Sequence, residues 1–305
     1  MTEKPLVSVI INCYNSEKYL RETIDSLIAQ TYENWEAIFW DNCSSDKTAE
    51  IINSYNEPRF RYYLAEKNTP LGKARNLAME KVSGEYLCFL DSDDIWEPMF
   101  LENCSTILSN NEDVGLVYTR YTHFSDTAKW LSRGIGNSGI IEISRLINGY
   151  NIGLSAALFK KSIVREKYLL FDTRFSLIED FDFFLKLACR TKVYYINLSL
   201  MNYRHHSHQS SNSNKWIEEY DMMINNIQSC KDYYPLMQYC DSIKKLQGRY
   251  KIMTAINQGE HFVALKNVFS QLWRYPSVLC YLLPIFGGKK IYALIIRTLG
   301  VFRHL

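Results

Sequence analysis

The amino-acid sequence predicts an α/β fold in which a mostly parallel, doubly wound sheet has helices on both faces. Short apolar runs alternate with amphipathic stretches in the first part of the chain, which is typical of βαβ units. The run Val7–Ile11 is apolar at nearly every position, as expected of a strand buried on both faces. From Lys215 onward the pattern is helical only, so a helical region is expected to follow the sheet.

The expected elements follow in order. The strands are Val7–Ile11, Glu36–Trp40, Phe60–Leu64 and Tyr86–Leu90. Asn15 or Ser16 caps a first helix, whose apolar residues recur at helical spacing: Tyr19, Leu20, Ile24, Leu27 and Ile28. Further helices are expected after Asp46 to about Tyr55 and over Leu71–Val82, Ile140–Tyr150, Ser162–Lys167 and Phe181–Cys189.

A polar run at Ser210–Asn214 predicts a boundary in the chain. We expect one domain over residues 1–214, with halves at about 1–115 and 116–214. A helical region is expected over 215–305.

Composition excludes several classes of protein. The 305 residues are 47% hydrophobic with a formal net charge of +2, so the chain is globular and lacks the basic field of a nucleic-acid-binding protein. Its eight Cys include no C-x-x-C pair, which favours reduced thiols in the cytosol over a disulfide scaffold or a zinc ribbon. The N-terminus does not resemble a signal peptide, and the apolar run Val278–Phe286 is too short to span a bilayer.

Polar side chains follow three of the expected strands. They lie at Asn12–Asn15, Asp41–Asp46 and Asp91–Asp94. Ligands of doubly wound sheets bind beyond the carboxyl ends of the strands, so we expect these segments to form one site.

Three carboxylates within four residues, Asp91, Asp93 and Asp94, repel one another unless a cation lies between them. Their oxygens suit Mg²⁺ or Mn²⁺, and a diphosphate of a substrate would complete the coordination. The alternative is a solvated acidic turn. No G-x-G-x-x-G pattern follows the first strand, and Gly287–Lys290 lacks the P-loop spacing, so neither a nicotinamide cofactor nor a P-loop nucleotide is expected.

Three segments together resemble family 2 glycosyltransferases, which have the GT-A fold. They read VSVIINCYNSEKYLRETIDSLIAQTYENWEAIFWDNCSSDKT, LGKARNLAMEKVSGEYLCFLDSDDIWEP and FDTRFSLIEDFDFFLKL, and the resemblance covers about residues 5–210. It implies an inverting, metal-dependent hexosyltransferase that takes its sugar from a UDP-, dTDP- or GDP-sugar, with UDP favoured.

The resemblance also implies donor-binding residues. Asn12 and Tyr14 match positions that contact the base, and Asp41 and Asn42 match the pair that recognises base and ribose. Members that bind uracil often have Asp at the position of Asn42, where an amide oxygen can still accept a hydrogen bond. Arg75 matches a residue near the nucleotide.

Within the acidic segment, Asp91 is expected to bind the donor with Ser92 beside it, and Asp93 to bind the metal, with Asp94 as a second ligand. Among three His residues after Tyr203, His206 matches a position at the metal or diphosphate, whereas His205 and His208 do not. The alternative for this cluster is a zinc site or a solvated polar loop.

Asp180 matches the general base of the family. Transfer with inversion needs one group to take the proton of the acceptor hydroxyl, and an enclosed carboxylate with a raised pKa can do this. Glu179 and Asp182 lie nearby, and the alternative is a helix N-terminus at which acidic residues are favoured by the dipole.

The segment 271–305 contains five Lys or Arg, no Asp or Glu, and many aromatic residues. This composition favours a membrane surface, and a core-packing helical pair or an oligomer interface is the alternative. The leading hypothesis is therefore a cytoplasmic enzyme at the inner face of the membrane that glycosylates a lipid-linked glycan for surface polysaccharide. A sugar-nucleotide nucleotidyltransferase and a catalytically silent glycan-binding protein are the alternatives.

Overall fold

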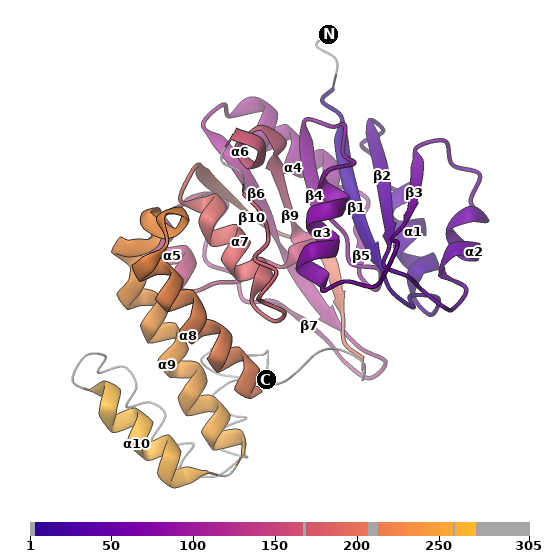
Figure 1. Cartoon of the computed structure of the whole chain (residues 1–305). Helices are drawn as coiled ribbons and strands as arrows, with labels where there is room; N and C mark the ends of the chain where they lie inside the picture. The colour runs from indigo at the N-terminus through magenta and orange to yellow at the C-terminus, as the bar shows by residue number, and fades with distance from the viewer. Residues whose placement is uncertain (1–3, 167–168, 207–212, 259, 273–305) are drawn as a thin grey trace. The chain divides into compact units, whose positions relative to one another are not determined.

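The computed structural model describes residues 4–166, 169–206, 213–258 and 260–272 (Figure 1). The chain divides into two compact units, Met1–Gln209 and Ser210–Leu305. The first contains a ten-stranded sheet, and the second is helical throughout its described residues.

The sheet of the first unit confirms the predicted fold class. Its strands lie in the order β3-β2-β1-β4-β9-β6-β10-β5, with β7 beside β6 and β8 beside β10. Strands β1, β2, β3, β4, β6 and β10 run in one direction, and the other four run against them. The strands are β1 (Val7–Cys13), β2 (Trp35–Asp41), β3 (Phe60–Leu64), β4 (Tyr86–Phe89), β5 (Ile95–Trp96), β6 (Val114–Phe124), β7 (Lys129–Leu131), β8 (Gly139–Ile141), β9 (Ala157–Lys160) and β10 (Lys192–Arg204).

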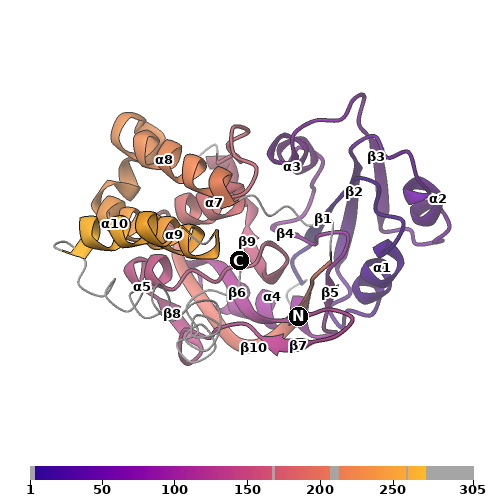
Figure 2. The same cartoon turned by 90° about the horizontal axis from the view of Figure 1, so that it is seen from below.

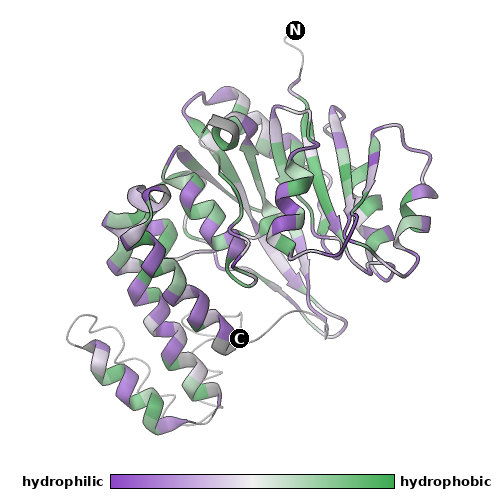
Figure 3. Ribbon diagram, in the orientation of Figure 1, coloured by the Kyte–Doolittle hydropathy of each residue, from purple (hydrophilic) through white to green (hydrophobic). Residues whose placement is uncertain are grey.

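Burial explains why the sequence of the central strands is mostly apolar. Strands β1 and β2 are covered on both faces, and β1 is mostly green in the hydropathy colouring of Figure 3. Strand β3 lies at the edge of the sheet and is only partly buried. Apolar burial is the main favourable contribution to folding, so these runs determine the centre of the sheet.

Helices cover both faces of the sheet (Figure 2). Helices α1 (Leu20–Ile28), α2 (Thr48–Asn53) and α4 (Phe100–Asn110) contribute to one core, in which Leu20, Ile24 and Leu27 of the predicted stripe are buried. Helices α3 (Leu71–Met79) and α7 (Glu179–Ala188) lie on the other face. There the ring of Phe183 stacks on that of Phe171 at 4.3 Å between centroids. The remaining helices of this unit are η1 (Leu154–Ala156), α5 (Ile143–Asn148) and α6 (Lys161–Glu166).

Three expected boundaries are wrong. Helix α1 begins at Leu20 after Tyr19, so neither Asn15 nor Ser16 caps it. Residues Gly139–Ile141 form β8 against β10, so α5 begins only at Ile143. Helix α3 ends at Met79 instead of Val82, and the chain then passes closely beside β1 at Gly84. A Cβ atom at Gly84 would lie 2.5 Å from the carbonyl oxygen of Leu6, so only glycine fits there.

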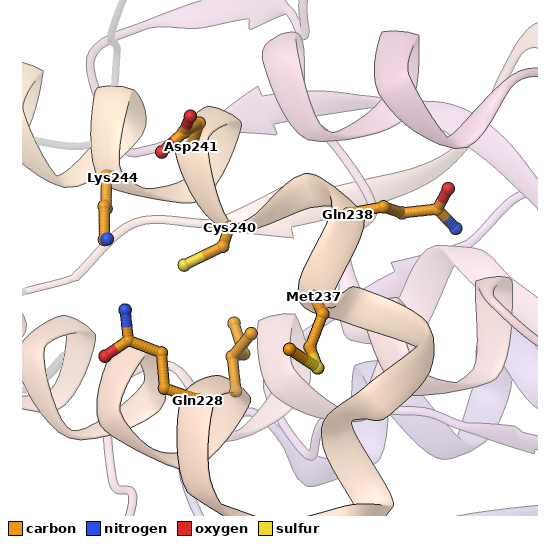
Figure 4. Close-up of a pocket in the computed structure, with 7 residues that line it drawn as sticks. Gln228, Met237, Gln238, Cys240, Asp241 and Lys244 are labelled. Carbon is orange, nitrogen blue, oxygen red and sulfur yellow. The ribbon is translucent and has the colours of Figure 1, made fainter.

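The second unit contains α8 (Ser213–Ser229), η2 (Lys231–Tyr239), α9 (Cys240–Asn257) and α10 (His261–Leu272). Its core includes Met223, Ile227, Ile243 and Val268. A cavity of about 270 Å³ lies among α8, η2 and α9, where Gln228, Met237, Cys240 and Lys244 line it (Figure 4). Among the described helices, none is long and apolar enough to cross a bilayer.

Candidate active site at the carboxyl edge of the sheet

The carboxyl ends of β2, β1 and β4 lie side by side, and the polar segments that follow them meet there. Cys13 of β1 pairs with Asp41 of β2, and Ile10 of β1 pairs with Phe89 of β4. The order of the strands therefore brings together the three polar segments that the sequence placed at one edge.

The loops after β1 and β2 are locked to each other. Asn15 has φ of 50° and Cys43 has φ of 67°, a left-handed conformation that is uncommon outside glycine. The side-chain oxygen of Asn15 accepts the N–H of Ser45 at 2.8 Å, and the N–H of Asn15 donates to the hydroxyl of Ser44 at 3.0 Å. The pairing holds this strained backbone in place, and the side chain of Tyr14 beside it is 56% exposed.

Asp41 and Asn42 are engaged within the protein. The hydroxyl of Tyr62 donates to Oδ2 of Asp41 at 2.7 Å, and the N–H of Ser44 donates to its Oδ1 at 2.8 Å. Burial, and then the charge of Asp41, raise the pKa of Tyr62. The Asn42 amide donates to the carbonyl oxygen of Thr69 at 2.7 Å and accepts the N–H of Thr69 at 3.1 Å. Asn42 thus fixes the segment before α3.

Asn12 differs from these two residues. Both polar atoms of its side-chain amide are buried, and neither has a hydrogen-bond partner in the described structure. An unsatisfied buried amide is costly, so its presence at the end of β1 favours a bound polar group that completes its hydrogen bonds.

The acidic segment after β4 separates into two kinds of carboxylate. The side chains of Asp91 and Asp93 are 35% and 28% exposed. Asp94 is buried, and both of its oxygens accept hydrogen bonds, at 2.7 Å from the hydroxyl of Ser155 and at 3.1 Å from the N–H of Arg204. Burial, and then the charges of Asp93 and Asp91, hold the pKa of Asp94 well above its usual range.

Three serines complete the shape of this segment. The hydroxyl of Ser155 also accepts the N–H of Asp91 at 3.0 Å, so it fixes both ends of the acidic run. Ser155 carried no signal in the sequence, because it lies in an ordinary apolar stretch. The hydroxyls of Ser92 and Ser16 are hydrogen-bonded at 2.8 Å, which joins the acidic segment to the loop after β1.

A buried arginine connects the acidic segment to α7. Arg75 of α3 donates through Nη1 to Oε1 of Glu179 at 2.9 Å and through Nη2 to Oδ1 of Asp91 at 3.4 Å. Its guanidinium also lies over the ring of Phe171, 5.4 Å from the centroid. One buried cation between two carboxylates holds three segments together, although they are far apart in the sequence.

Asp180 follows Glu179 and is partly buried. Burial, and then the negative charge of Glu179, raise its pKa to about 7, while Arg75 opposes the shift. Burial also raises the pKa of Asp91 to about 6, against the lowering effect of Arg75. Asp182 turns to an ion pair with Lys186 at 2.7 Å. All three acids of α7 lie in its first turn, where the dipole favours them, but only Asp180 combines partial exposure with a pKa near neutrality.

The histidines after β10 have different surroundings. Nε2 of His206 lies 2.8 Å from Oδ2 of Asp93, and its ring is 5.2 Å from that of Tyr19. Nε2 of His205 instead lies 2.9 Å from Nδ1 of His123. His208 lies outside the described residues. The sequence offered no sign of the contact between His205, which follows β10, and His123 of the neighbouring strand β6.

The side chains at this edge of the sheet suit a hard divalent cation that is bound together with a substrate. Within residues 4–166, 169–206, 213–258 and 260–272, no three His, Cys, Asp or Glu side chains converge as a preformed metal site. Mg²⁺ is usually held by one or two carboxylates with substrate phosphates completing the shell. Asp93 has a partly exposed carboxylate for this role and His206 lies against it, whereas Asp94 has both oxygens engaged in the protein.

The chain is similar to known glycosyltransferases in sequence and fold. The model of glycosyl transferase family 2 matches residues 8–167. An uncharacterised glycosyltransferase of Rickettsia typhi is 32% identical over 73% of this chain and 71% of its own. The UDP-Glc:α-D-GlcNAc-diphosphoundecaprenol β-1,3-glucosyltransferase WfgD of Escherichia coli is 28% identical over 81% of this chain and 97% of its own.

Among solved structures, the S. aureus TarS fragment 1–349 in complex with UDP has a TM-score of 0.65 at 19% identity, over 80% of this chain and 71% of its own, which shows a shared fold. The family match spans more than half of the chain and includes the strand-end segments described above. The chain is therefore a member of the family 2 glycosyltransferases.

Proposed function

We propose that this glycosyltransferase moves a sugar from a nucleotide diphosphate sugar to a hydroxyl of a glycan acceptor, with inversion at the anomeric carbon. The proposal rests on the surroundings of Asp180. Asp180 is a partly buried carboxyl with a pKa of about 7, adjacent in the chain to Glu179, which Arg75 connects to Asp91. A base with that pKa is ionised in useful amount at neutral pH and can still accept a proton.

The donor would lie over the ends of β1 and β2. The buried Asn12 amide and the exposed Tyr14 ring would contact the base, with Asp41 and Asn42 beside them. Asp91 and Ser92 would reach the ribose and sugar from the end of β4. A UDP-sugar is favoured, because WfgD is named for UDP-Glc and the TarS fragment was solved with UDP.

A divalent cation, Mg²⁺ or Mn²⁺, would be held by Asp93 with His206 beside it. When bound, such an ion stabilises the negative charge that develops on the leaving diphosphate. Asp94 is the second candidate ligand. Because both of its oxygens accept hydrogen bonds within the protein, it would instead help to position Asp93.

Asp180 would act on the acceptor. As the acceptor oxygen forms its bond to the anomeric carbon, Asp180 takes the hydroxyl proton, and the bond from that carbon to the diphosphate oxygen breaks. The nucleoside diphosphate leaves with the bonding electron pair. The protein thus holds one base on the acceptor side and stabilises the leaving group on the other, as inversion requires.

The acceptor is proposed to be a lipid-linked glycan in surface polysaccharide synthesis, handled at the cytoplasmic face of the membrane. WfgD acts on a sugar attached to diphosphoundecaprenol, which supports an acceptor of this class. The segment 271–305, with its Lys, Arg and aromatic residues and no acid, would contribute a peripheral contact with that membrane.

The test compares Asp180→Asn with wild type for donor binding and transfer. Because an amide is nearly isosteric but cannot take the proton, binding of the UDP-sugar should be almost unchanged. Turnover should fall at least roughly 10²-fold, the low end of the usual general-base contribution. Asp126→Asn, at an exposed turn, is the matched control. Near wild-type turnover in Asp180→Asn would remove Asp180 from this role. Absence of donor hydrolysis and transfer in wild type would favour a silent binding protein.

A further inference from the structure

Helix α10 of the second unit has two unlike faces. Ala264 and Val268 are fully buried, and α10 packs against α9. Phe262 and Phe269 are 82% and 62% exposed. Because α10 already has a buried face, the exposed phenylalanines form a second, separate apolar surface.

A cation lies between the two rings. Phe262, Lys266 and Phe269 are spaced i, i+4 and i+7, so they share one side of the helix, and Lys266 is also exposed. We call these three side chains the α10 outer face. A lysine at the centre of an apolar face is unfavourable in a dry protein interface, where Lys is depleted. It is well placed where aromatic bodies enter an apolar layer and the ammonium reaches anionic groups at its edge.

The residues that follow the α10 outer face in the sequence are also aromatic and cationic, with no acidic residue among them. Glu260 is the last acidic residue of the chain, and the 45 residues from His261 to Leu305 include Lys266 and five further Lys or Arg. A long segment without acids, and with aromatic and cationic residues throughout, is complementary to a surface that is apolar inside and negative outside.

We propose that the α10 outer face binds the surface of an anionic phospholipid bilayer, with the helix axis parallel to the membrane plane. Phe262 and Phe269 enter the boundary between headgroups and acyl chains, and Lys266 pairs with a lipid phosphate. The inference deepens the proposed action on a lipid-linked acceptor, since it places membrane contact in the second unit, apart from the donor site of the first unit.

The experiment measures sedimentation of the full chain with phosphatidylcholine vesicles, with and without phosphatidylglycerol. Phe262→Ser with Phe269→Ser should weaken binding at least roughly tenfold, since each removes apolar area from the bilayer. Lys266→Glu should weaken binding to anionic vesicles at low salt and have less effect at high salt. The double change Tyr234→Ser with Met237→Ser is the matched control, because it removes two exposed apolar side chains of η2.

Three results would overturn the inference. One is wild-type vesicle binding by the Phe262 and Phe269 variant. Another is a wild-type oligomer that this variant converts to monomer, since the face would then bind a second copy of the chain. The third is loss of folded protein, measured by circular dichroism, which would place the rings in the core. Hydrolysis of UDP-sugar should be unaffected in every variant. Its absence in wild type would contradict the proposed function and leave the vesicle result intact.

Discussion

Replacing Glu179 by Gln changes the charge beside the proposed base with little change of shape. In the wild type, burial and the charge of Glu179 raise the pKa of Asp180 to about 7, so kcat/KM should fall about tenfold for each pH unit below that value. At an effective dielectric constant of about 20, two like charges on adjacent side chains repel by roughly 3 kcal/mol, which corresponds to about two pH units. Solvent reduces this effect at a partly exposed site, so we expect the acid limb to move down by about one unit.

The assay is kcat/KM for the donor between about pH 5 and 9, because that profile reports the pKa values of the free enzyme. Asp172→Asn is the control. It removes a carboxylate of the segment before α7, and that carboxylate pairs with Arg174 at 2.9 Å. The reasoning is refuted if the limb of Glu179→Gln stays near pH 7 or moves upward. It is refuted equally if the control shifts by the same amount.

The remaining predictions concern stability and metal. Arg75→Met should lower the free energy of unfolding in urea by about 3–5 kcal/mol, because it leaves the buried Glu179 carboxylate without its cation. Asp180→Asn should raise Tm at pH 8 and have little effect at pH 4. The folded state holds the pKa of Asp180 near 7 against 3.8 in the unfolded chain, so its contribution to stability is lost as pH rises through 7. EDTA should abolish transfer and Mn²⁺ or Mg²⁺ restore it, and full activity in chelator would contradict a metal. Asp93→Ala should lose metal-dependent donor binding, measured by calorimetry with and without Mn²⁺.

The sequence predicts the first half of the sheet well because its signals are local. Buried parallel strands such as Val7–Cys13 are apolar at most positions, and the helices between them keep a 3.6-residue stripe. Strands β6 and β10 were not predicted, because their pairing joins residues distant in the chain and leaves irregular burial patterns. The expected helix start at Ile140 is wrong for the same reason, since pairing of Gly139–Ile141 with β10 outweighs local preference.

In the candidate site, too, the sequence predicts the features that are local and misses those that depend on tertiary contacts. A run of acids after a strand is visible in the sequence, and family resemblance points to Asp180 and His206. The sequence does not tell Asp94 from Asp93, because their difference comes from Ser155 and the backbone of Arg204. Nor does the sequence show that the side-chain amide of Asn12 is buried without a hydrogen-bond partner, since burial and hydrogen bonding depend on tertiary packing.

The hydrogen bonds around the acidic segment have a consequence for the order of events during folding. Asp94 is bonded to residues 61 and 110 positions later in the chain, Arg75 to one 104 positions later, and Asp93 lies against one 113 positions later. Contacts across such long loops form slowly, because chain entropy is lost before they contribute. On a ribosome, the first strands can pair while β10 is not yet synthesised, and the carboxylates then repel one another without their partners. The acidic segment can therefore reach its hydrogen-bonded arrangement only after β10 has joined the sheet.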